Sequence, residues 1–596
     1  MSSTDVLTLY RTRVAEQQAA DARQERRHGH LANARLAVAG AAALTAWLVF
    51  GSKAAGAAWL IVPVLAFVGL AIWHDRVLES RRRARRTAAF YQRGIDRLSE
   101  AWAGTGDDGA RFLRADHLYD ADLDLFGHGS LFQLVTTARV RSGEETLAGW
   151  LLAPATPAEI RARQEAVREL APRVDLREEL ALLGEDVGAG VHPDLLAGWG
   201  TAPEIRVARW ERRVAAALAA VTAGALLFWA AFDAGTPVLL AGLSLEVVFA
   251  LRARTRVRRI LSAADAPAHD LTLLAGVLAL FERQSFTSHK LQALRRALDE
   301  TGQPASRRIA ELQRLIDMVR SRHNQFFAPI AALLLLGTQL AFALERWRLR
   351  SGPHLSTWLR VVGEFEALCS LASYASEHPG DAFPDIVDGD ARFDGRQIAH
   401  PLIAEGRAVP NDVRLGRDRR LLLVSGSNMS GKSTLLRAVG VNAVLGLAGA
   451  PVRAAALTLS PLAIGASLRT VDSLQAGRSR FYAEITRLRA IVALTEGPLP
   501  VLFLLDELLS GTNSHDRQIG AEAVIRGLLD RHAIGLLTTH DLALSSIADR
   551  LGPAAENVHF ADAFDGGSLR FDYRMRPGVV KTSNALALMR AVGLEV

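Results

Sequence analysis

The sequence predicts an α+α/β fold: a helical region that carries two apolar hairpins, then a C-terminal α/β domain with parallel strands. Three observations support this fold class. Half of the 596 residues are hydrophobic (49%) and the mean hydropathy is +0.13, which is high for a soluble protein and indicates membrane spans. The apolar runs of the first half come in pairs separated by short turns. In the last third, short apolar runs end at a glycine loop or at carboxylates, as buried parallel strands do.

Charge and cysteine content narrow the classes of protein. The net charge of +7 permits an acidic partner such as nucleic acid or anionic lipid. Much of that charge lies in arginine runs beside apolar stretches, which favours anchoring next to a membrane. The single cysteine, Cys369, excludes an intramolecular disulfide and fits a reducing compartment. The polar and charged first thirty residues predict no cleavable signal peptide.

The first hairpin is predicted at residues 36–73. Residues 1–35 are arginine-rich and predict a cytoplasmic N-terminal helix. Two apolar runs then follow, separated by a glycine, a serine and Lys53, and residues 74–115 form a basic linker helix. Arginines flank the hairpin on both sides and only Lys53 lies in the turn, so the positive-inside rule places both ends in the cytoplasm. The alternative is a buried helical hairpin of a soluble protein.

The second hairpin is predicted at residues 214–251, with arginines again on both sides. Its return leg carries Glu246, which we interpret as lying near the cytoplasmic interface and not as a transport site. A third apolar run, residues 326–344, contains Pro329 and Gln339 and is flanked by basic residues. We expect this run to be a buried helix of the cytoplasmic part, because a fifth crossing would place the C-terminal domain outside the cell.

The C-terminal domain is organised around a glycine loop. Residues 421–424 are apolar and predict a buried parallel strand, and a loop of the form G-x-x-x-x-G-K-S follows at once and opens a helix. In this context the backbone N–H groups and the helix N-terminus bind phosphates, Lys432 reaches the β- and γ-phosphates of ATP, and Ser433 ligates Mg²⁺. The predicted ATP-binding residues of the loop are Gly426, Ser427, Asn428, Met429, Ser430, Gly431, Lys432, Ser433 and Thr434.

Two carboxylates end a second apolar run. Residues 501–505 predict another buried strand, and Asp506 and Glu507 follow it. At the carboxyl end of a strand beside the glycine loop, such a pair divides the work. Asp506 would hold Mg²⁺ through water, and Glu507 would orient and deprotonate the attacking water. The sequence therefore predicts a P-loop ATPase.

The helical region resembles the core, or lever, domain of the MutS mismatch-repair ATPases. The resemblance rests on Thr146, Leu147, Trp150, Leu151 and Pro154, followed by Ile160 and the run Arg163-Gln164-Glu165-Ala166-Val167. In that family this pattern links the helical lever to its neighbours. Residues 359–374 look like the last lever helix. The resemblance therefore implies a core at 116–379, interrupted by the hairpin at 214–251.

From residue 380 to 596 the chain resembles MutS domain V, an ABC-type P-loop ATPase domain. The loop is close to the family's "PNM.GKST", with Asn428 on the phosphates, and Leu536 to Asp541 are similar to its third strand end. There His540 would contact the γ-phosphate as a catalytic residue beside Glu507 and Lys432. Asp472, Gly477, Ser479, Phe481 and Glu484 follow the family signature, in which Ser479 reaches the γ-phosphate of the opposite subunit. The resemblance thus implies a homodimer through the ATPase domains.

The chain also departs from the family pattern. Arg480 replaces a threonine after the signature serine, and Ala408 replaces an aromatic that stacks on adenine. Val409 and Tyr573 are the candidates to line the base instead. The N-terminal mismatch-reading domain has no counterpart in this sequence, and the clamp of the lever is replaced by the hairpin at 214–251.

Three functions fit these features. The first is a multi-pass ATPase of the cytoplasmic membrane, in contact with membrane lipid, with its ATPase domain in the cytoplasm and ATP-driven dimer closure that moves the lever helices. By family resemblance its partner would be DNA, including mismatched DNA. The second is a membrane-bound regulatory or scaffold ATPase with a protein partner. The third is an ABC-type transporter, which the absence of an L-S-G-G-Q signature and four marginal spans disfavour.

Overall fold

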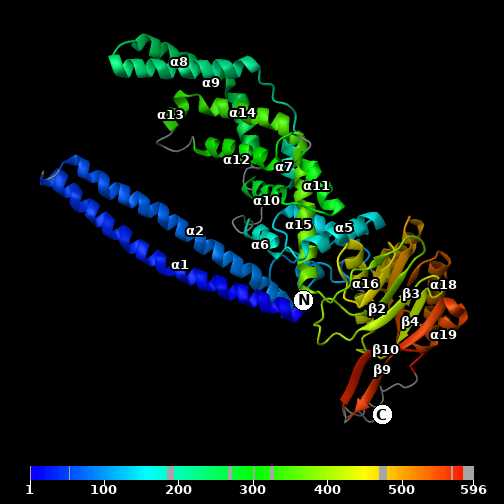
Figure 1. The fold of residues 1–596 in the computed structure, drawn as a ribbon. Helices are drawn as coiled ribbons and strands as arrows, with labels where there is room; N and C mark the ends of the chain where they lie inside the picture. Colours follow the sequence, from blue (N-terminus) through cyan, green and yellow to red (C-terminus); the bar gives the residue numbers. More distant parts are fainter. Residues whose placement is uncertain are drawn as a thin grey trace.

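The computed structural model describes residues 2–52, 54, 56–183, 193–265, 271–299, 302–321, 328–427, 429–468, 480–509, 511–565 and 568–580. The described part of the chain before residue 378 is helical, and the part after it contains both strands and helices. Two long helical hairpins project from a central helical body, and the α/β domain lies at the other end of that body (Figure 1).

The first hairpin is formed by α1 (Ser3–Ala46), which continues as one π-helical turn to Gly51, and α2 (Ile61–Leu98). A capping box between Ser2 and Asp5 starts α1. The helices lie side by side along their length and form the long blue arm of Figure 1. The N-terminal helix and the first apolar run, predicted as separate segments, are therefore continuous in α1, and the second apolar run continues into the linker in α2. The linker helix, predicted to reach residue 115, ends at Leu98. No proline interrupts residues 2–52, so nothing breaks the helix where its composition turns from polar to apolar.

The base of this hairpin is attached to the helical body. Tyr10 of α1 and Tyr91 of α2 pack with Ala181 of α6 (Val174–Leu183) in a separate apolar cluster. Arg97 of α2 forms a bidentate ion pair with Glu377, at 2.7 and 2.5 Å. Both partners are buried, and a planar guanidinium held this way fixes direction as well as distance.

The helical body is built around α15 (Leu355–Glu377), whose side chains are buried on nearly every face. Gly143 and Gly363 let α4 approach α15 closely: a Cβ at Gly363 would lie 2.7 Å from the backbone oxygen of Ser142. The surrounding helices are α3 (Leu131–Val135), α4 (Arg141–Leu152), α5 (Pro157–Leu170), α7 (Pro193–Thr201), α10 (Leu271–Arg283), α11 (His289–Asp299) and α12 (Ala305–Ser321).

The second hairpin consists of α8 (Arg209–Phe232) and α9 (Thr236–Asp265). The third apolar run is split at Leu335, which has a φ of 47°, into α13 (Ala328–Leu333) and α14 (Leu336–Ser351). In α14 the residues Leu340, Ala341, Phe342 and Leu344 are buried, as predicted for this run, whereas α13 buries only Ala331 and leaves Ile330 51% exposed. Glu246 is buried too, and lines a cavity of about 710 Å³ between α9 and α13–α14.

Four helices of the described residues are long and apolar enough to cross a membrane: Ser3–Gly51, Ala58–Leu98, Trp210–Phe232 and Thr236–Ala264. Only 6%, 6%, 17% and 22% of their apolar windows are buried within the protein. They coincide with the two hairpins predicted from the sequence.

The α/β domain contains two sheets. The larger has the strand order β10-β9-β4-β8-β7-β6 and is parallel except for the β9–β10 hairpin; the smaller has the order β1-β5-β2-β3. The strands are β1 (Asp385–Ile386), β2 (Phe393–Ile398), β3 (Asn411–Leu415), β4 (Leu421–Ser425), β5 (Ala456–Leu459), β6 (Ala463–Ser467), β7 (Val501–Asp506), β8 (Ile534–Thr539), β9 (Ala555–Asp565) and β10 (Ser568–Pro577).

The central strand β4 is buried on both faces. Leu422 and Val424 pack into the main core, whereas Leu421 and Leu423 pack into a second core on the other side. Alternate side chains of a strand point to opposite faces, so a run of apolar residues is what a doubly covered strand requires. The helices of this domain are α16 (Lys432–Ala448), α17 (Arg480–Ala493), α18 (Ser514–Asp530) and α19 (Leu542–Leu551).

A loop of the helical region connects it to the α/β domain. Asp122 accepts a hydrogen bond from the backbone N–H of Leu468 at 2.8 Å and forms an ion pair with Arg487 of α17. Its backbone oxygen accepts a hydrogen bond from Arg437 of α16 at 3.1 Å. This one residue therefore joins the helical region to both α16 and α17.

Candidate nucleotide-binding site

The glycine loop lies between β4 and α16, as predicted. Gly426 has a φ of +150° and Gly431 a φ of +102°. A Cβ at Gly426 would lie 2.8 Å from Ser430 Oγ and 3.2 Å from the backbone oxygen of Phe560, so a side chain there would force the loop apart. Gly431 is the N-cap of α16. The N-terminus of this helix therefore faces the cup of the loop, where its partial positive charge favours an anion.

Lys432 is folded back over the loop. Its Nζ donates hydrogen bonds to the backbone oxygens of Gly426 at 2.9 Å and Ser427 at 2.8 Å. Burial lowers the pKa of Lys432 from its ordinary value, while Glu507 and Asp506 act in the opposite direction. The hydroxyls of Ser427 and Ser430 are buried and have no hydrogen-bond partner among the described residues. The loop thus holds polar groups that an incoming phosphate can satisfy.

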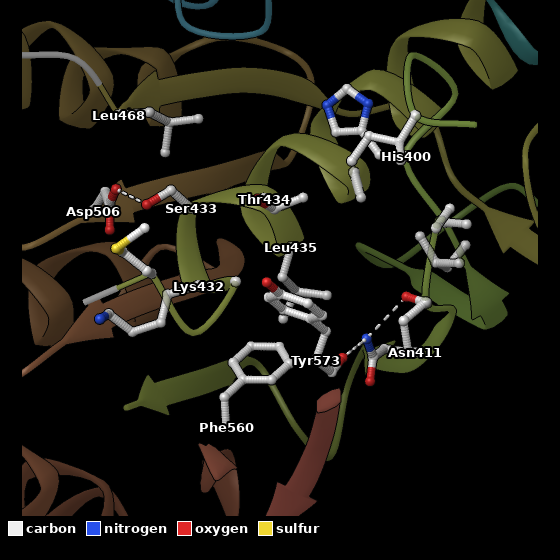
Figure 2. Close-up of a pocket in the computed structure, with 18 of the residues that line it drawn as sticks. His400, Asn411, Lys432, Ser433, Thr434, Leu435, Leu468, Asp506, Phe560 and Tyr573 are labelled. Carbon is white, nitrogen blue, oxygen red and sulfur yellow. Dashed lines mark hydrogen bonds between the residues drawn. The ribbon is translucent and has the colours of Figure 1, made fainter. Parts of the chain in front are cut away.

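Asp506, Ser433 and Thr538 meet beside the loop. The Ser433 hydroxyl donates to Asp506 Oδ2 at 2.6 Å, and the Thr538 hydroxyl donates to Asp506 Oδ1. The three residues come from β7, the first turn of α16 and β8, which are brought together because parallel strands end at one edge of a sheet. Figure 2 shows Ser433 and Asp506 on one wall of the pocket. A hydroxyl and a carboxylate are oxygen ligands of the kind Mg²⁺ prefers, so the residues present fit this ion.

Glu507 and His540 form a second pair farther out. His540 Nδ1 lies 3.1 Å from Glu507 Oε1, and the two side chains are 50% and 35% exposed. Glu507 has a φ of 49°, a conformation that costs free energy for a side chain other than glycine's. Its backbone N–H donates to the backbone oxygen of Thr538 at 3.2 Å. The carboxylate is thereby held at the rim of the pocket and not in the core.

The opposite wall of the pocket comes from β3 and β10. The Asn411 side-chain amide donates to the backbone oxygen of Tyr573 at 3.0 Å (Figure 2). The Asn411 Oδ1 accepts a hydrogen bond from the Met575 N–H at 2.7 Å. The Tyr573 ring packs against Gly431: a Cβ there would lie 3.1 Å from it. Together with Val409, these residues enclose one side of a cavity of about 890 Å³. That volume suits a nucleotide-sized ligand.

His400 lines the same pocket from beneath. It is buried and accepts a hydrogen bond from the Leu402 N–H at Nδ1, at 3.2 Å. Burial, with a smaller contribution from Arg437, lowers the pKa of His400 to about 4. His400 is therefore neutral at physiological pH and brings no charge to the site.

The structure brings most of the predicted residues to one pocket. Lys432, Ser433, Thr434, Gly431, Met429, Val409, Tyr573, Asp506 and Glu507 line it, and Gly426, Ser427 and Ser430 form the loop beneath. His540 lies outside the lining, next to Glu507. Asn428 and Ser479 lie outside the described residues.

Four further residues line the pocket: His400, Asn411, Leu468 and Phe560. His400 and Asn411 belong to the segments that carry the resemblance to MutS domain V, but the sequence assigned them no role in the site. Leu468 and Phe560 were not singled out, because each is an apolar residue of its own segment and no spacing connects the two.

Comparisons with known proteins agree with this geometry. Residues 422–595 match the family model of MutS domain V. The chain is 36% identical over 247 residues to DNA mismatch repair protein MutS 2 of Halobacterium salinarum and 34% identical over 245 residues to DNA mismatch repair protein MutS of Natronomonas pharaonis. It is 33% identical over 247 residues to DNA mismatch repair protein MSH3 of Coccidioides immitis.

These matches cover a minor part of each protein. They span 39%, 39% and 40% of this chain, and 27%, 27% and 22% of the relatives. The chain thus aligns with about a quarter of each relative's length. The glycine loop, the Asp506–Glu507 strand end and the His540 strand end all lie within the matched family model. The C-terminal domain of this protein is a MutS domain V, which is an ABC-type P-loop ATPase domain.

Proposed function

We propose that the protein is a membrane-anchored MutS-type ATPase, in which ATP closes two copies of the C-terminal domain on each other and so moves the helical region. The observation that carries this proposal is the grouping of Lys432, Ser433, Asp506 and Glu507 at one edge of a sheet beside a nucleotide-sized pocket. That grouping supplies a phosphate cradle, a metal-binding wall and a base in one place.

The residues would act as follows. The backbone N–H groups of the loop bind the phosphates of ATP. Lys432 gives up its hydrogen bonds to the two backbone oxygens and binds the phosphates as well. Ser433 and Asp506 hold Mg²⁺, which when bound neutralises charge on the β- and γ-phosphates. Glu507 accepts a proton from the attacking water, and His540, 3.1 Å away, orients that carboxylate or contacts the γ-phosphate. Val409 and Tyr573 line the base.

Exposure of the outer residues supports a dimer. Glu507 and His540 remain open to solvent at the rim, and catalysis by a carboxylate is more effective where water is excluded. A second copy laid over this rim would cover both, with Ser479 of that copy at the γ-phosphate as the family resemblance implies. MutS-family ATPases typically dimerise, which supports the same arrangement.

Exposed apolar side chains support the membrane anchor. Both hairpins carry them in their outer halves: Leu44, Trp47, Phe50, Trp59, Leu227, Phe232, Leu240 and Val248 are all more than half exposed. In water such a surface would drive aggregation, whereas in a bilayer it is satisfied. The two hairpins project from the same side of the helical body (Figure 1). The ATPase domain would then lie in the cytoplasm.

DNA is proposed as a partner because the relatives are named as mismatch repair proteins. A second candidate is a membrane-bound regulatory or scaffold ATPase with a protein partner. The observation that favours this second candidate is that the similarity covers only about two fifths of this chain and includes the ATPase end. The shared part therefore supports the ATPase and says nothing of the partner. The net charge of +7 suits DNA and anionic lipid equally.

The ATPase proposal is tested with detergent-solubilised full-length protein. We expect it to retain ATP with Mg²⁺ and, once loaded, to shift in mass from 64.4 kDa towards twice that value. Lys432→Ala should weaken ATP binding by about tenfold or more and abolish the shift, because a charge on the phosphates is lost. Lys53→Ala, the same change in the turn predicted for the first hairpin, serves as the control. An intact protein that does not retain Mg-ATP would contradict the proposal.

A further inference from the structure

A second large cavity lies far from the nucleotide pocket, where the first hairpin meets the helical body. Its volume is about 730 Å³. It is lined by α2, α6, α10 and α15, by the segment that follows α2, and by the segment between α3 and α4. None of the residues described for the ATP site lines it. The cavity therefore sits at the joint between the proposed membrane anchor and the core.

The cavity is strongly cationic. Its lining contains six arginines and two carboxylates: Arg93, Arg97, Arg111, Arg139, Arg141 and Arg177, with Asp107 and Glu144. Some of this charge is neutralised within the protein. Arg97 pairs with Glu377, Arg111 pairs with Asp107 and Glu144, and Arg141 pairs with Glu145. Arg93 and Arg139 also have interactions within the protein, so the argument for a ligand depends on Arg177.

Arg177 is the decisive residue. It is 2% exposed, and its Nη2 donates to the backbone oxygen of Ala171 at 2.8 Å. Its Nε and Nη1 have no hydrogen-bond partner among the described residues, and no carboxylate there lies within ion-pair distance. A buried guanidinium without an anion is costly, because it loses its hydration and gains little in return. Such a group in a cavity wall indicates a missing acceptor.

A second unsatisfied donor lines the same cavity. The hydroxyl of Thr136, at the end of α3, is buried and has no partner among the described residues. Arg177 and Thr136 belong to different elements, so their meeting at one cavity is a property of the fold and not of a local sequence. A buried guanidinium and a buried hydroxyl, both with donors that lack an acceptor, together select an anion with several acceptor oxygens.

The other wall of the cavity is apolar. It is formed by Phe90, Trp102, Leu180, Ala181, Leu273 and Cys369. An inorganic anion alone would leave this wall facing water, and the volume exceeds what phosphate fills. The lining therefore fits a molecule with an anionic head and an apolar or aromatic body.

We propose that this cavity binds a phosphorylated small molecule with an apolar or aromatic body, held by Arg177 and Thr136 at its phosphate. A guanidinium presents two parallel N–H donors that match a phosphate, and the planar body would pack against Trp102 and Phe90. Because Phe90 belongs to α2 and Arg177 to α6, the bound molecule joins the hairpin to the helical body. The inference does not depend on ATP hydrolysis.

The test uses phenyl phosphate as the probe and full-length Lys432→Ala protein in detergent, so that the nucleotide pocket contributes little. We expect one saturable site by isothermal titration calorimetry. Inorganic phosphate has the anionic group without the ring, and phenol has the ring without the phosphate. Each should bind at least tenfold more weakly than phenyl phosphate. Arg177→Gln and, as a milder change, Thr136→Val should each weaken phenyl phosphate binding about tenfold or more. Arg168→Gln is the matched control, because Arg168 lies over the Phe383 ring and outside this cavity.

Each outcome decides the proposal. Loss of binding in Thr136→Val with an unchanged Arg168→Gln supports it even if Arg177→Gln does not fold. No saturable binding of phenyl phosphate to the Lys432→Ala protein overturns it, and so does binding that neither cavity variant alters. Displacement of phenyl phosphate from the wild-type protein by ATP would place the probe in the nucleotide pocket and overturn it as well. Failure of ATP binding would leave this result unaffected.

Discussion

Asp506 and Glu507 are adjacent carboxylates with different surroundings. Asp506 accepts hydrogen bonds from the hydroxyls of Ser433 and Thr538 and is turned towards the sheet edge. Glu507 has rotated out through a positive φ and contacts His540 at the rim. Two hydrogen bonds fix the Asp506 carboxylate beside Ser433, whereas the rim position leaves the Glu507 carboxylate open to water. The local backbone therefore assigns the two residues to different tasks.

Glu507→Gln tests that assignment. The amide keeps the size of the side chain but cannot accept a proton, so we expect ATP affinity within about threefold of wild type and turnover reduced by roughly 10²-fold or more. Equilibrium binding of ATP and the steady-state rate of phosphate release measure the two quantities. Unchanged hydrolysis in the variant would remove Glu507 as the base.

Glu366 makes stability depend on pH. It is buried in α15 and accepts hydrogen bonds from the N–H of Val140 at 2.9 Å and of Arg139 at 3.3 Å. Burial raises the pKa of Glu366 to about 8 from its ordinary 4.5. Between these two values the folded protein keeps a proton that the unfolded chain has released, so stability falls as pH rises through this window.

Glu366→Gln should flatten that dependence. The neutral amide carries no proton to lose, so the slope of unfolding free energy against pH, about 1.4 kcal/mol per unit for one group, should decrease between pH 5 and 8. Glu144, whose pKa is raised to about 7 mainly by burial, titrates in the same window and remains in the variant. Urea denaturation in detergent at several pH values gives the slope. An identical slope in both proteins would show that Glu366 is ionised in the folded state.

At the scale of elements, the two hairpins differ in how they are held. The first is fixed at its base by the Tyr10–Tyr91 cluster and by the Arg97–Glu377 pair. The second contacts α13 and α14 along part of its length. In both, the outer part carries apolar side chains that are more than half exposed. In the first hairpin the inner half thus attaches the helices to the body of the protein, and the outer half is the part proposed to enter the membrane.

Deletion of both hairpins should therefore release the protein from membranes. We expect the full-length chain in the membrane pellet and a chain lacking residues 36–73 and 214–251 in the soluble fraction, because about 30 Å of hydrocarbon requires spans of that length. The ATPase activity of the deleted chain reports whether its C-terminal domain still folds. A fully soluble intact chain would contradict the anchor.

The sequence predicted which helices and strands exist better than it predicted where they begin and end. The β4–loop–α16 unit and the Asp506–Glu507 strand end follow from local patterns, since a buried strand and a glycine loop each have a fixed chemistry. The change from polar to apolar composition in α1 predicts a boundary that the structure does not have, because a helix can pass from water into an apolar environment without a proline to interrupt it. Leu468 and Phe560 reach the pocket from distant apolar segments, and no local pattern marks them.

At the scale of the whole molecule, the ATPase domain shares one hydrophobic core with the helical region, and polar contacts such as those of Asp122 join the two as well. Asp122 contacts both α16, which begins at the loop, and α17, which begins directly after the segment containing Ser479. Movement of either helix during closure would be passed to the helical body at this point. The same contact explains how a signal in the helices could reach the nucleotide.

DNA binding by the whole molecule distinguishes the two candidate functions, a DNA-binding ATPase and a regulatory or scaffold ATPase with a protein partner. If DNA is the partner, the solubilised protein should bind duplex, mismatched or branched DNA at low salt, with an affinity that falls steeply as salt rises because counterions are released. Fluorescence anisotropy at 50 and 200 mM salt measures this, with heparin as a non-specific competitor. No binding at the lower concentration would favour the protein-partner alternative.

The unbroken helix α1 has a mechanical consequence. At about 1.5 Å per residue its 44 residues form a stiff rod of roughly 66 Å, paired with α2 along its length. A tilt of about ten degrees at the base would sweep the far end sideways by roughly 11 Å, given the same rise per residue. In the proposed membrane anchor that end lies among lipid chains, so each stroke would push the surrounding bilayer aside. Viscous drag from the membrane would then slow the nucleotide cycle, so the fluidity of the lipid would set a ceiling on how fast the enzyme can run.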